Sequence, residues 1–231
     1  MRSAKHGIKV LTLAVLAVIG VMAVGAVGAQ GQLPGGSTLG EFLVNLGTPI
    51  KNAATGVQLE IGYLLVEARD LKIECETLKV DFGAITNLTD GTTEVRFLGC
   101  VVNNHEGNPI TGCEFKELGT VKAAALVLPK VHNGERFLLF KPLEGVTNLA
   151  VVSFKGGQGC ILPLNNPVTG SVVAKVTGNE LNATTQPILF NETNQLLSGD
   201  VLKYGSLANT AYLDGTGHVK LSDPESKLGI H

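Results

Sequence analysis

Apolar and polar residues alternate with a period of two through most of the chain after Val57, and this alternation restricts the fold more than any other feature. The stretches Leu59–Leu65, Leu71–Cys75 and Val172–Val176 show it most clearly. One apolar face and one largely polar face are typical of a half-buried antiparallel strand. Further strand candidates are Thr92–Val102, Thr120–Leu128, Arg136–Lys141, Leu149–Lys155, Gln186–Phe190, Asp200–Tyr204 and Val219–Leu221.

Turn-forming residues separate these strand candidates at roughly 10–15-residue intervals, and no helical crossovers alternate with them. The pattern predicts an all-β fold over 57–231: an antiparallel β-sandwich or barrel-like domain of ten or more strands. The turn signals are Asp90-Gly91, Asn133-Gly134, Glu144-Gly145, Gly156-Gly157, Asn165-Asn166-Pro167, Gly178-Asn179 and Asp214-Gly215.

A short helix is expected before the strands begin. The sequence Thr38-Leu39-Gly40-Glu41 matches a capping box, in which the threonine hydroxyl and the glutamate carboxylate satisfy free amides of the first helical turn. Apolar residues at helical spacing continue to Leu46, and Gly47 and Pro49 end the segment. Residues 30–56 are therefore interpreted as a lead-in that contains a short helix.

The first 29 residues have the three parts of a secretory signal peptide. Arg2, Lys5 and Lys9 precede an uncharged run from Val10 to Ala29, which ends in the small residues Val27-Gly28-Ala29. The alternative is an uncleaved membrane anchor, because about 20 apolar residues can span a bilayer as a helix. The small residues favour cleavage after Ala29, and the mature protein is then expected outside the cell or in the cell envelope, without a membrane segment.

The charge of the presumed mature chain, 30–231, restricts its partners. It has 15 basic and 20 acidic residues, a net charge of −5, and its charges are scattered. This balance argues against nucleic acid or an anionic membrane surface as partner. An unknown cell-surface or extracellular partner is expected instead.

The four cysteines, Cys75, Cys100, Cys113 and Cys160, all follow the signal segment, and an even count in an exported chain predicts two disulfides. A bond between Cys100 and Cys113 is favoured, because the polar stretch 101–112 between them resembles a hairpin connection. Cys75 and Cys160 then pair by elimination. A zinc site is the alternative, but the chain has no CxxC pair and the spacings match no zinc pattern.

Cys75 lies where the apolar pattern changes register. Apolar positions are odd-numbered up to Cys75 and even-numbered from Leu78 to Phe82. Because strand side chains alternate strictly, a continuous strand must contain one extra residue near Glu76-Thr77, as a β-bulge does. Cys75 is therefore expected on the core face, in a buried disulfide.

Motifs that would indicate catalysis or cofactor binding are missing from the sequence. It has no GxSxG nucleophile elbow, HExxH zinc helix, Walker A loop or GxGxxG fingerprint. The histidines after the signal segment, His105, His132, His218 and His231, are interpreted as solvated surface residues. No catalytic, cofactor-binding or metal-binding residue is predicted, and the sequence favours a protein that is not an enzyme.

The carboxylates offer weak alternatives. Glu74 and Glu76 share a strand face and could bind a cation or act as an acid/base pair, although a solvated charge ladder is the preferred interpretation. The segments Asp90-Gly91-Thr92 and Asp214-Gly215-Thr216-Gly217 resemble calcium loops but lack further oxygen ligands. Hairpin turns are expected there.

Aromatic residues and glycosylation sequons add two smaller expectations. There is no Trp, which lowers the case for polysaccharide binding. Phenylalanines in apolar strand patterns are expected in the core: Phe82, Phe97, Phe137, Phe140, Phe154 and Phe190. Sequons begin at Asn87, Asn182 and Asn191 and matter only if the source glycosylates exported proteins.

A framework of strand motifs and cysteines extends from Leu64 to about Lys175. Its segments are Leu64-Leu65-Val66-Glu67-Ala68, Leu71-Lys72-Ile73-Glu74-Cys75, Val95-Arg96-Phe97-Leu98-Gly99-Cys100, Gly112-Cys113, Leu138-Leu139-Phe140-Lys141-Pro142, Gly159-Cys160-Ile161-Leu162 and Val168-Thr169-Gly170-Ser171-Val172. In this framework the chain resembles uncharacterised exported bacterial proteins of the actinobacterial type. The resemblance implies secretion, four paired cysteines and an all-β domain, and it implies no activity or cofactor.

Three functions are consistent with these features. The favoured one is a non-catalytic structural or interaction β-domain that is secreted or held in the cell envelope. The first alternative is a β-barrel that binds a small apolar ligand or lipid, which requires an interior cavity of a few hundred Å³. The second is an extracellular hydrolase, which requires a histidine or a carboxylate pair to converge in a cleft.

Overall fold

The computed structural model describes residues 38–44, 57–66, 70–156, 159–178, 182–195, 201–221, 225 and 227–231. These residues belong to a compact unit formed by 32–231. The predicted signal peptide, residues 1–29, lies outside the described residues, as do parts of the predicted turns at 156–157 and 178–179.

Strands make up most of the described chain, which confirms the predicted all-β class. In chain order the first strands are β1 (Thr38–Leu39), β2 (Phe42–Val44), β3 (Val57–Val66), β4 (Leu71–Cys75), β5 (Thr77–Ile85), β6 (Gly91–Leu98), β7 (Val101–Asn103), β8 (Val121–His132) and β9 (Glu135–Lys141). The later elements are β10 (Asn148–Ser153), β11 (Asn165–Thr169), β12 (Val172–Val176), β13 (Asn182–Ala183), β14 (Thr185–Phe190), α1 (Glu192–Gln195), β15 (Lys203–Tyr204), β16 (Asn209–Thr210), β17 (Tyr212–Lys220) and β18 (Leu228–Ile230).

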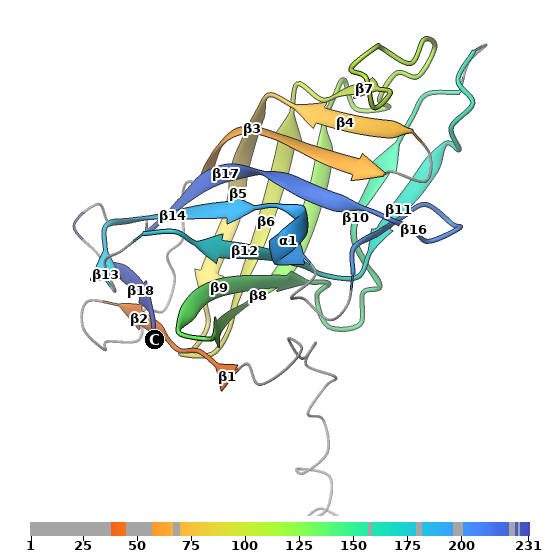
Figure 1. Cartoon of the computed structure of the whole chain (residues 1–231). Coiled ribbons are helices and arrows are strands. Elements are labelled where there is room, and N and C mark those ends of the chain that lie inside the picture. The colour runs from red at the N-terminus through yellow and green to blue at the C-terminus, as the bar shows by residue number, and fades with distance from the viewer. Residues whose placement is uncertain are drawn as a thin grey trace, which may run out of the picture. The chain divides into compact units, whose positions relative to one another are not determined.

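Antiparallel pairs connect the long strands into one path that turns back on itself. The path runs β5–β6–β8–β9–β12–β14–β17–β3–β4, and its last strand, β4, is joined to its first, β5, by the single residue Glu76. In Figure 1, β3, β17, β14 and β12 cross in front of β5, β6 and β8 at a steep angle. The result is the predicted sandwich- or barrel-like arrangement around a common interior.

Shorter strands branch from this path. β10 pairs with β8 at Ala123, outside the part of β8 that pairs with β9, and leads on to β11, β15 and β16. β7 lies along β4. A small separate sheet contains β13, β18 and β2.

The Asn133-Gly134 turn confirms one of the predicted hairpins. It joins β8 to β9, and its two residues have φ values of 50° and 78°. Two positive φ values in a two-residue loop are the requirement of a type I′ turn, whose twist matches that of the strands it connects. β8 and β9 are thereby held in register over Leu126–His132 and Glu135–Lys141.

The short helix predicted from the capping box is wrong in the part that the structure describes. Thr38–Leu39 pairs with β8, and Phe42–Val44 pairs with β18. The amide of Glu41 donates to the carbonyl of His231, and the amide of His231 donates back to the carbonyl of Glu41. These backbone groups are satisfied by pairing with distant strands, so the local helical preference of the segment is overridden.

Two segments predicted as turns lie within strands. Asn165-Asn166-Pro167 belongs to β11, where the carbonyl of Pro167 accepts a hydrogen bond from the amide of Gly205. Asp214-Gly215 belongs to β17, at a register shift against β3. For Asp214-Gly215 the reason is that glycine is favoured at both turns and bulges, so its presence alone does not tell one from the other.

The change of face after Cys75 is confirmed, and its cause is a change of partner strand. Cys75 and Leu78 are both buried although the stretch between them contains one residue more than an uninterrupted strand would have between two positions on the same face. Glu76 forms a bend, and its amide donates to the carbonyl of Leu98. The extra residue therefore lies where the chain leaves β3 and β7 and begins to pair with β6.

A second register shift, between Val80 and Phe82, has an effect that the sequence did not predict. It leaves Phe82 52% exposed, although the alternation placed this residue in the core. The bulge inserts Asp81 and thereby reverses the faces of the residues that follow. The other phenylalanines predicted in the core are buried or partly buried: Phe97, Phe137, Phe140, Phe154 and Phe190.

All four cysteines are paired, but the predicted connectivity is wrong. The bonds are Cys75–Cys100, with a Cα–Cα distance of 4.0 Å, and Cys113–Cys160, with 4.6 Å. The stretch expected to be a simple hairpin contains β7, which pairs with β4 and carries the chain away from Cys100.

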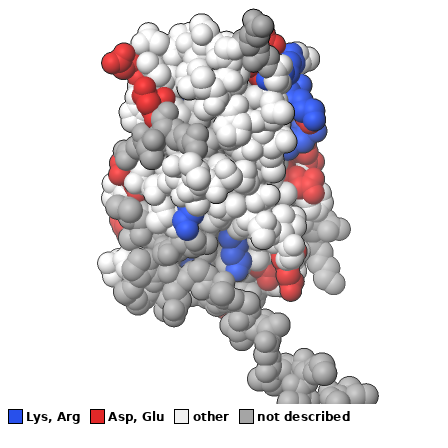
Figure 2. All heavy atoms as spheres, turned by 90° about the vertical axis from the view of Figure 1, so that its right-hand side faces the viewer, with Lys and Arg blue, Asp and Glu red and all other residues white. Residues whose placement is uncertain are grey.

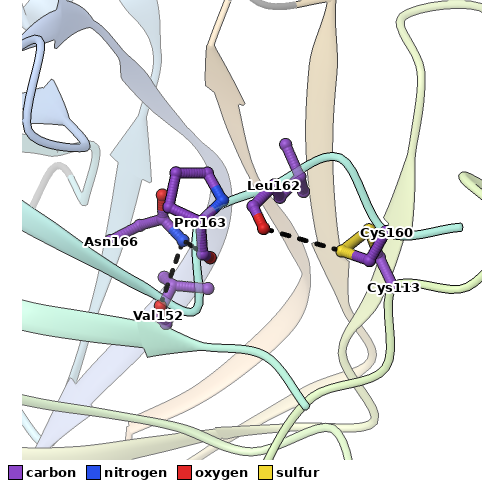
Figure 3. The surroundings of a disulfide bond; sticks show 6 residues. All are labelled: Cys113, Val152, Cys160, Leu162, Pro163 and Asn166. Carbon is purple, nitrogen blue, oxygen red and sulfur yellow. Dashed lines mark hydrogen bonds between the residues drawn. A yellow bond between two sulfur atoms is a disulfide. The ribbon is translucent and has the colours of Figure 1, made fainter. Parts of the chain in front are cut away.

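The residues after Cys113 explain its partner. The amide of Lys155 donates to the carbonyl of Glu114, and Phe115 forms a β-bridge with Phe154. This contact brings Cys113 beside the loop that contains Cys160, as Figure 3 shows.

Loss of either disulfide should destabilise the fold by a predictable amount. The Cys113–Cys160 bond spans 47 residues and the Cys75–Cys100 bond spans 25 residues. By the loop-entropy relation, the Cys113→Ser/Cys160→Ser variant should lose about 4 kcal/mol of unfolding free energy and the Cys75→Ser/Cys100→Ser variant about 3.5 kcal/mol. Urea denaturation of each variant measures these losses.

The variant Cys100→Ser/Cys113→Ser is the control for connectivity. It removes one partner from each observed bond, so its loss should approach the sum of the other two. A loss no larger than that of one bond would contradict the observed pairing.

Candidate functional site: an apolar cavity in the interior

The interior of the sheet contains an apolar cavity of about 150 Å³. Its wall is formed by side chains from every strand of the path that turns back on itself, together with β10, β11 and Leu202. The lining residues are Leu64, Ile73, Cys75, Leu78, Thr93, Val95, Phe97, Val121, Ala123, Ala125, Phe140, Leu149, Ala150, Val152, Val168, Val172, Ile188, Phe190, Leu202 and Leu213.

Small side chains on two neighbouring strands leave this space unfilled. Ala123 and Ala125 face the cavity from β8, and Ala150, which pairs with Ala123, faces it from β10. A methyl group projects much less far than the Val, Leu and Phe side chains that line the rest of the wall. The cavity is therefore a consequence of alanine at inward-facing strand positions.

Among the residues that the structure describes, those that line the wall carry no ionised group and no free side-chain hydrogen-bond donor. The one hydroxyl among the lining residues belongs to Thr93, and it donates to the carbonyl of Phe82 at 3.2 Å. The sulfur of Cys75 is bonded to Cys100. Water bound here would lack the two to four polar partners that it needs, and a dry apolar cavity of this size is large enough for benzene or xenon.

The loop 159–164, which precedes β11, is held in place by the contacts drawn in Figure 3. The side-chain amide of Asn166 donates to the carbonyl of Pro163 at 2.8 Å, and Asn166 is fully buried. Val168 lies two residues further along β11, and Val152 on β10 pairs with Asn166. Both valines line the cavity. The Cys113–Cys160 bond holds the start of the same loop, so this side of the wall is fastened at both ends.

The histidines considered at the sequence level are scattered in the structure. His105, His218 and His231 are exposed, and His132 is partly buried beside the β8–β9 turn. Within the described parts of the chain, no three or more His, Cys, Asp or Glu side chains lie together in a group that could hold a metal ion. The described histidines thus give a hydrolase hypothesis no geometric support.

Glu74 and Glu76 have different neighbours and do not resemble an acid/base pair. Glu74 forms an ion pair with Lys72 at 2.6 Å and accepts a hydrogen bond from the side chain of Asn103. The hydrogen bond from Lys72 is the main cause that lowers the pKa of Glu74, which is the wrong direction for a general acid. The carboxylate of Glu76 lies against Gly99, where an added Cβ would be 2.6 Å from Oε2.

Asp90 stabilises the turn in which it lies. Its carboxylate accepts hydrogen bonds from the side chains of Thr86 and Asn87, which confirms the predicted turn between β5 and β6. The sequon residue Asn87 is exposed, whereas Asn191 caps α1 by accepting a hydrogen bond from the amide of Asn194. The side chain of Asn182 lies outside the described residues.

Comparison of the chain with protein-family models, with curated proteins and with solved structures finds no match. The described part of the chain contains no helix long and apolar enough to cross a bilayer. The geometry of the cavity is therefore the basis of the functional argument.

Sequence reasoning did not locate the cavity. The available signal was the run Ala123-Ala124-Ala125 inside a predicted strand, because alternation makes two of these three residues face the same side. Alanine at consecutive inward positions indicates missing volume, but the residues opposite them were known only from the fold.

The lowered pKa of Glu74 predicts a pH dependence of stability. Its folded-state pKa lies below its unfolded-state value, so the ion pair with Lys72 stabilises the fold above the ordinary glutamate pKa of about 4.3. This contribution is lost as the pH falls through the lower folded-state pKa. Glu74→Gln should make the acid-side decline of unfolding free energy shallower, measured by urea denaturation at several pH values.

The neighbouring substitution Glu76→Gln is the control for this test. It removes a carboxylate two residues away, at the bend that follows β4, and leaves the ion pair between Glu74 and Lys72 in place. If both variants altered the decline equally, the effect would not come from the contacts of Glu74.

Proposed function

We propose that this protein is a non-catalytic β-domain that binds a small apolar ligand in its interior. The single observation that carries the proposal is the cavity of about 150 Å³, whose described lining residues are almost all apolar. The cavity is smaller than the few hundred Å³ that the sequence-based hypothesis of an apolar-ligand barrel expected, so the proposed ligand is correspondingly smaller. An interior filled by side chains would have removed the basis of this function.

The size of the sheet supports this assignment. With β4 and β5 counted as one strand, the path that encloses the cavity has eight strands. An interior of this size is either just filled by side chains or holds one small ligand. Alanine on β8 and β10 favours the second outcome here.

The chemistry of the wall limits the ligand to an apolar molecule. A polar ligand group buried against Val, Leu and Phe side chains would lose its hydrogen bonds to water without replacement, which costs free energy. An apolar ligand gains by leaving water and by filling empty space.

Two disulfides are consistent with an extracellular or otherwise oxidising environment. We place the protein outside the cell or in the cell envelope, as the signal-like segment 1–29 predicts. An extracellular ligand-binding role agrees with this location.

An interaction surface is a second candidate function, and one observation favours it. Figure 2 shows a face on which uncharged residues predominate over charged side chains. Several aliphatic side chains of β10 and the loop before β11 are exposed, among them Val151, Leu164 and Ile161, which is 85% exposed. Co-sedimentation or pull-down with native cell envelope tests this candidate separately from ligand binding.

Benzene is a suitable probe for the cavity, because a dry apolar space of this volume can hold it. Titration with benzene should raise the melting temperature of the protein in a saturable manner. At a benzene concentration of 100 times its dissociation constant the gain in unfolding free energy should be about 2.7 kcal/mol. Differential scanning calorimetry measures both quantities.

The variant Ala123→Leu should fill the cavity and abolish the effect of benzene. Ala124→Leu is the matched control, because Ala124 lies on the opposite face of the same strand, and this variant should respond to benzene like the wild type. If Ala123→Leu does not fold, Ala150→Leu fills the same space from β10. The proposal fails if benzene does not stabilise the wild type, or if it stabilises the filled variant equally.

A further inference from the structure

A second apolar cavity, of about 70 Å³, lies next to the first. It is lined mainly by apolar residues of β2, β5, β6, β8, β9, β17 and β18, including Ala84, Val127 and Leu138. Two residues line both cavities, Thr93 and Phe140. The interior is thus divided into two compartments at these side chains.

The side chain of Phe140 lies between the two cavities. Its partner on β8 is Val127, which lines the second cavity, and its partner on β12 is Val172, which lines the first. On the side of the first cavity the ring packs against Phe190, with a centroid distance of 5.7 Å. Phe140 is therefore the position of β9 at which the strand borders both cavities, whereas Leu138 borders the second cavity.

Phe140 has space into which it can move. The first cavity lies directly beside its ring, and side-chain rotation between staggered rotamers needs only such adjacent space. Thr93, the other shared residue, is much smaller, and its hydroxyl is held by the carbonyl of Phe82. Rotation of one aromatic side chain would thus connect the two compartments.

We propose that the ligand is an unbranched aliphatic chain that extends through both cavities past a displaced Phe140. This inference rests on the proposed function and specifies its ligand class. Two small compartments in series accept a narrow flexible chain, whereas a compact ring system as large as both together cannot pass between them. The lining of the second cavity also includes the exposed Lys220, and a polar head group of the ligand lies outside the apolar part of the walls.

Chain-length dependence of binding tests the inference. In the wild type, the affinity for n-alkanols from n-butanol to n-decanol should rise by about fourfold per methylene as long as each added methylene is buried. Ala84→Leu occupies the second cavity only, so the rise should stop at a shorter chain. Isothermal titration calorimetry measures both series.

Benzene separates failure of this inference from failure of the proposed function. It should bind the wild type and Ala84→Leu with the same affinity, because it needs only the first cavity, and it should not bind Ala123→Leu. In a second outcome, benzene binds the wild type and Ala84→Leu while the n-alkanol affinities of both proteins stop rising at the same chain length. That result would refute the aliphatic-chain ligand and leave the proposed ligand cavity in place. Where benzene binds neither, both fail.

Phe140→Ala provides an independent test should Ala84→Leu not fold. Removal of the ring connects the compartments permanently, so the affinity for the longer alkanols should rise more than the affinity for benzene. An equal rise in affinity for benzene and for the longer alkanols would show that Phe140 does not separate the two cavities. This result would overturn the proposal.

Discussion

The step at Glu76 is the constraint on which the rest of the structure depends. At this residue the chain leaves one set of partner strands and joins another, so β4 and β5 belong to opposite ends of the same hydrogen-bonded path. The path can enclose an interior because its ends are consecutive in sequence. The Cys75–Cys100 bond fastens the same place, joining the end of β4 to the residues just after β6. A continuous strand without this step would keep Cys75 and Leu78 on opposite faces and leave one of them in water.

The sequence predicted those features of the fold that depend on neighbouring residues. Period-two alternation located most strands, and Asn133-Gly134 identified the β8–β9 turn, because both signals act over a few residues. The failures all involve distant partners. The capping box at Thr38 could not compete with pairing to β8 and β18, and the bulge at Asp81 that exposes Phe82 is set by pairing with β6. Disulfide connectivity failed for the same reason, since β7 takes the chain away from Cys100 before it reaches Cys113.

The candidate site was harder to predict from the sequence than the fold was. A catalytic centre often has a motif, because its chemistry needs particular residue types at particular spacing. A cavity is defined by volume that no side chain occupies, and volume is a property of residues brought together from many strands. Ala123 and Ala150 are ordinary strand residues until the fold places them opposite each other. For this reason the negative motif search and the observed cavity do not conflict.

The empty interior also affects how the protein responds to hydrostatic pressure. Unfolding eliminates internal voids, so a folded state with unfilled space occupies a larger volume than the unfolded chain and its water, and compression favours unfolding. The cavity beside Ala123 therefore makes the unliganded protein more sensitive to compression than a fully packed sheet of the same length. Under the proposed function, a bound ligand would fill that volume and reduce the sensitivity. Occupancy of the interior and the volume change of unfolding would then be two measures of the same space.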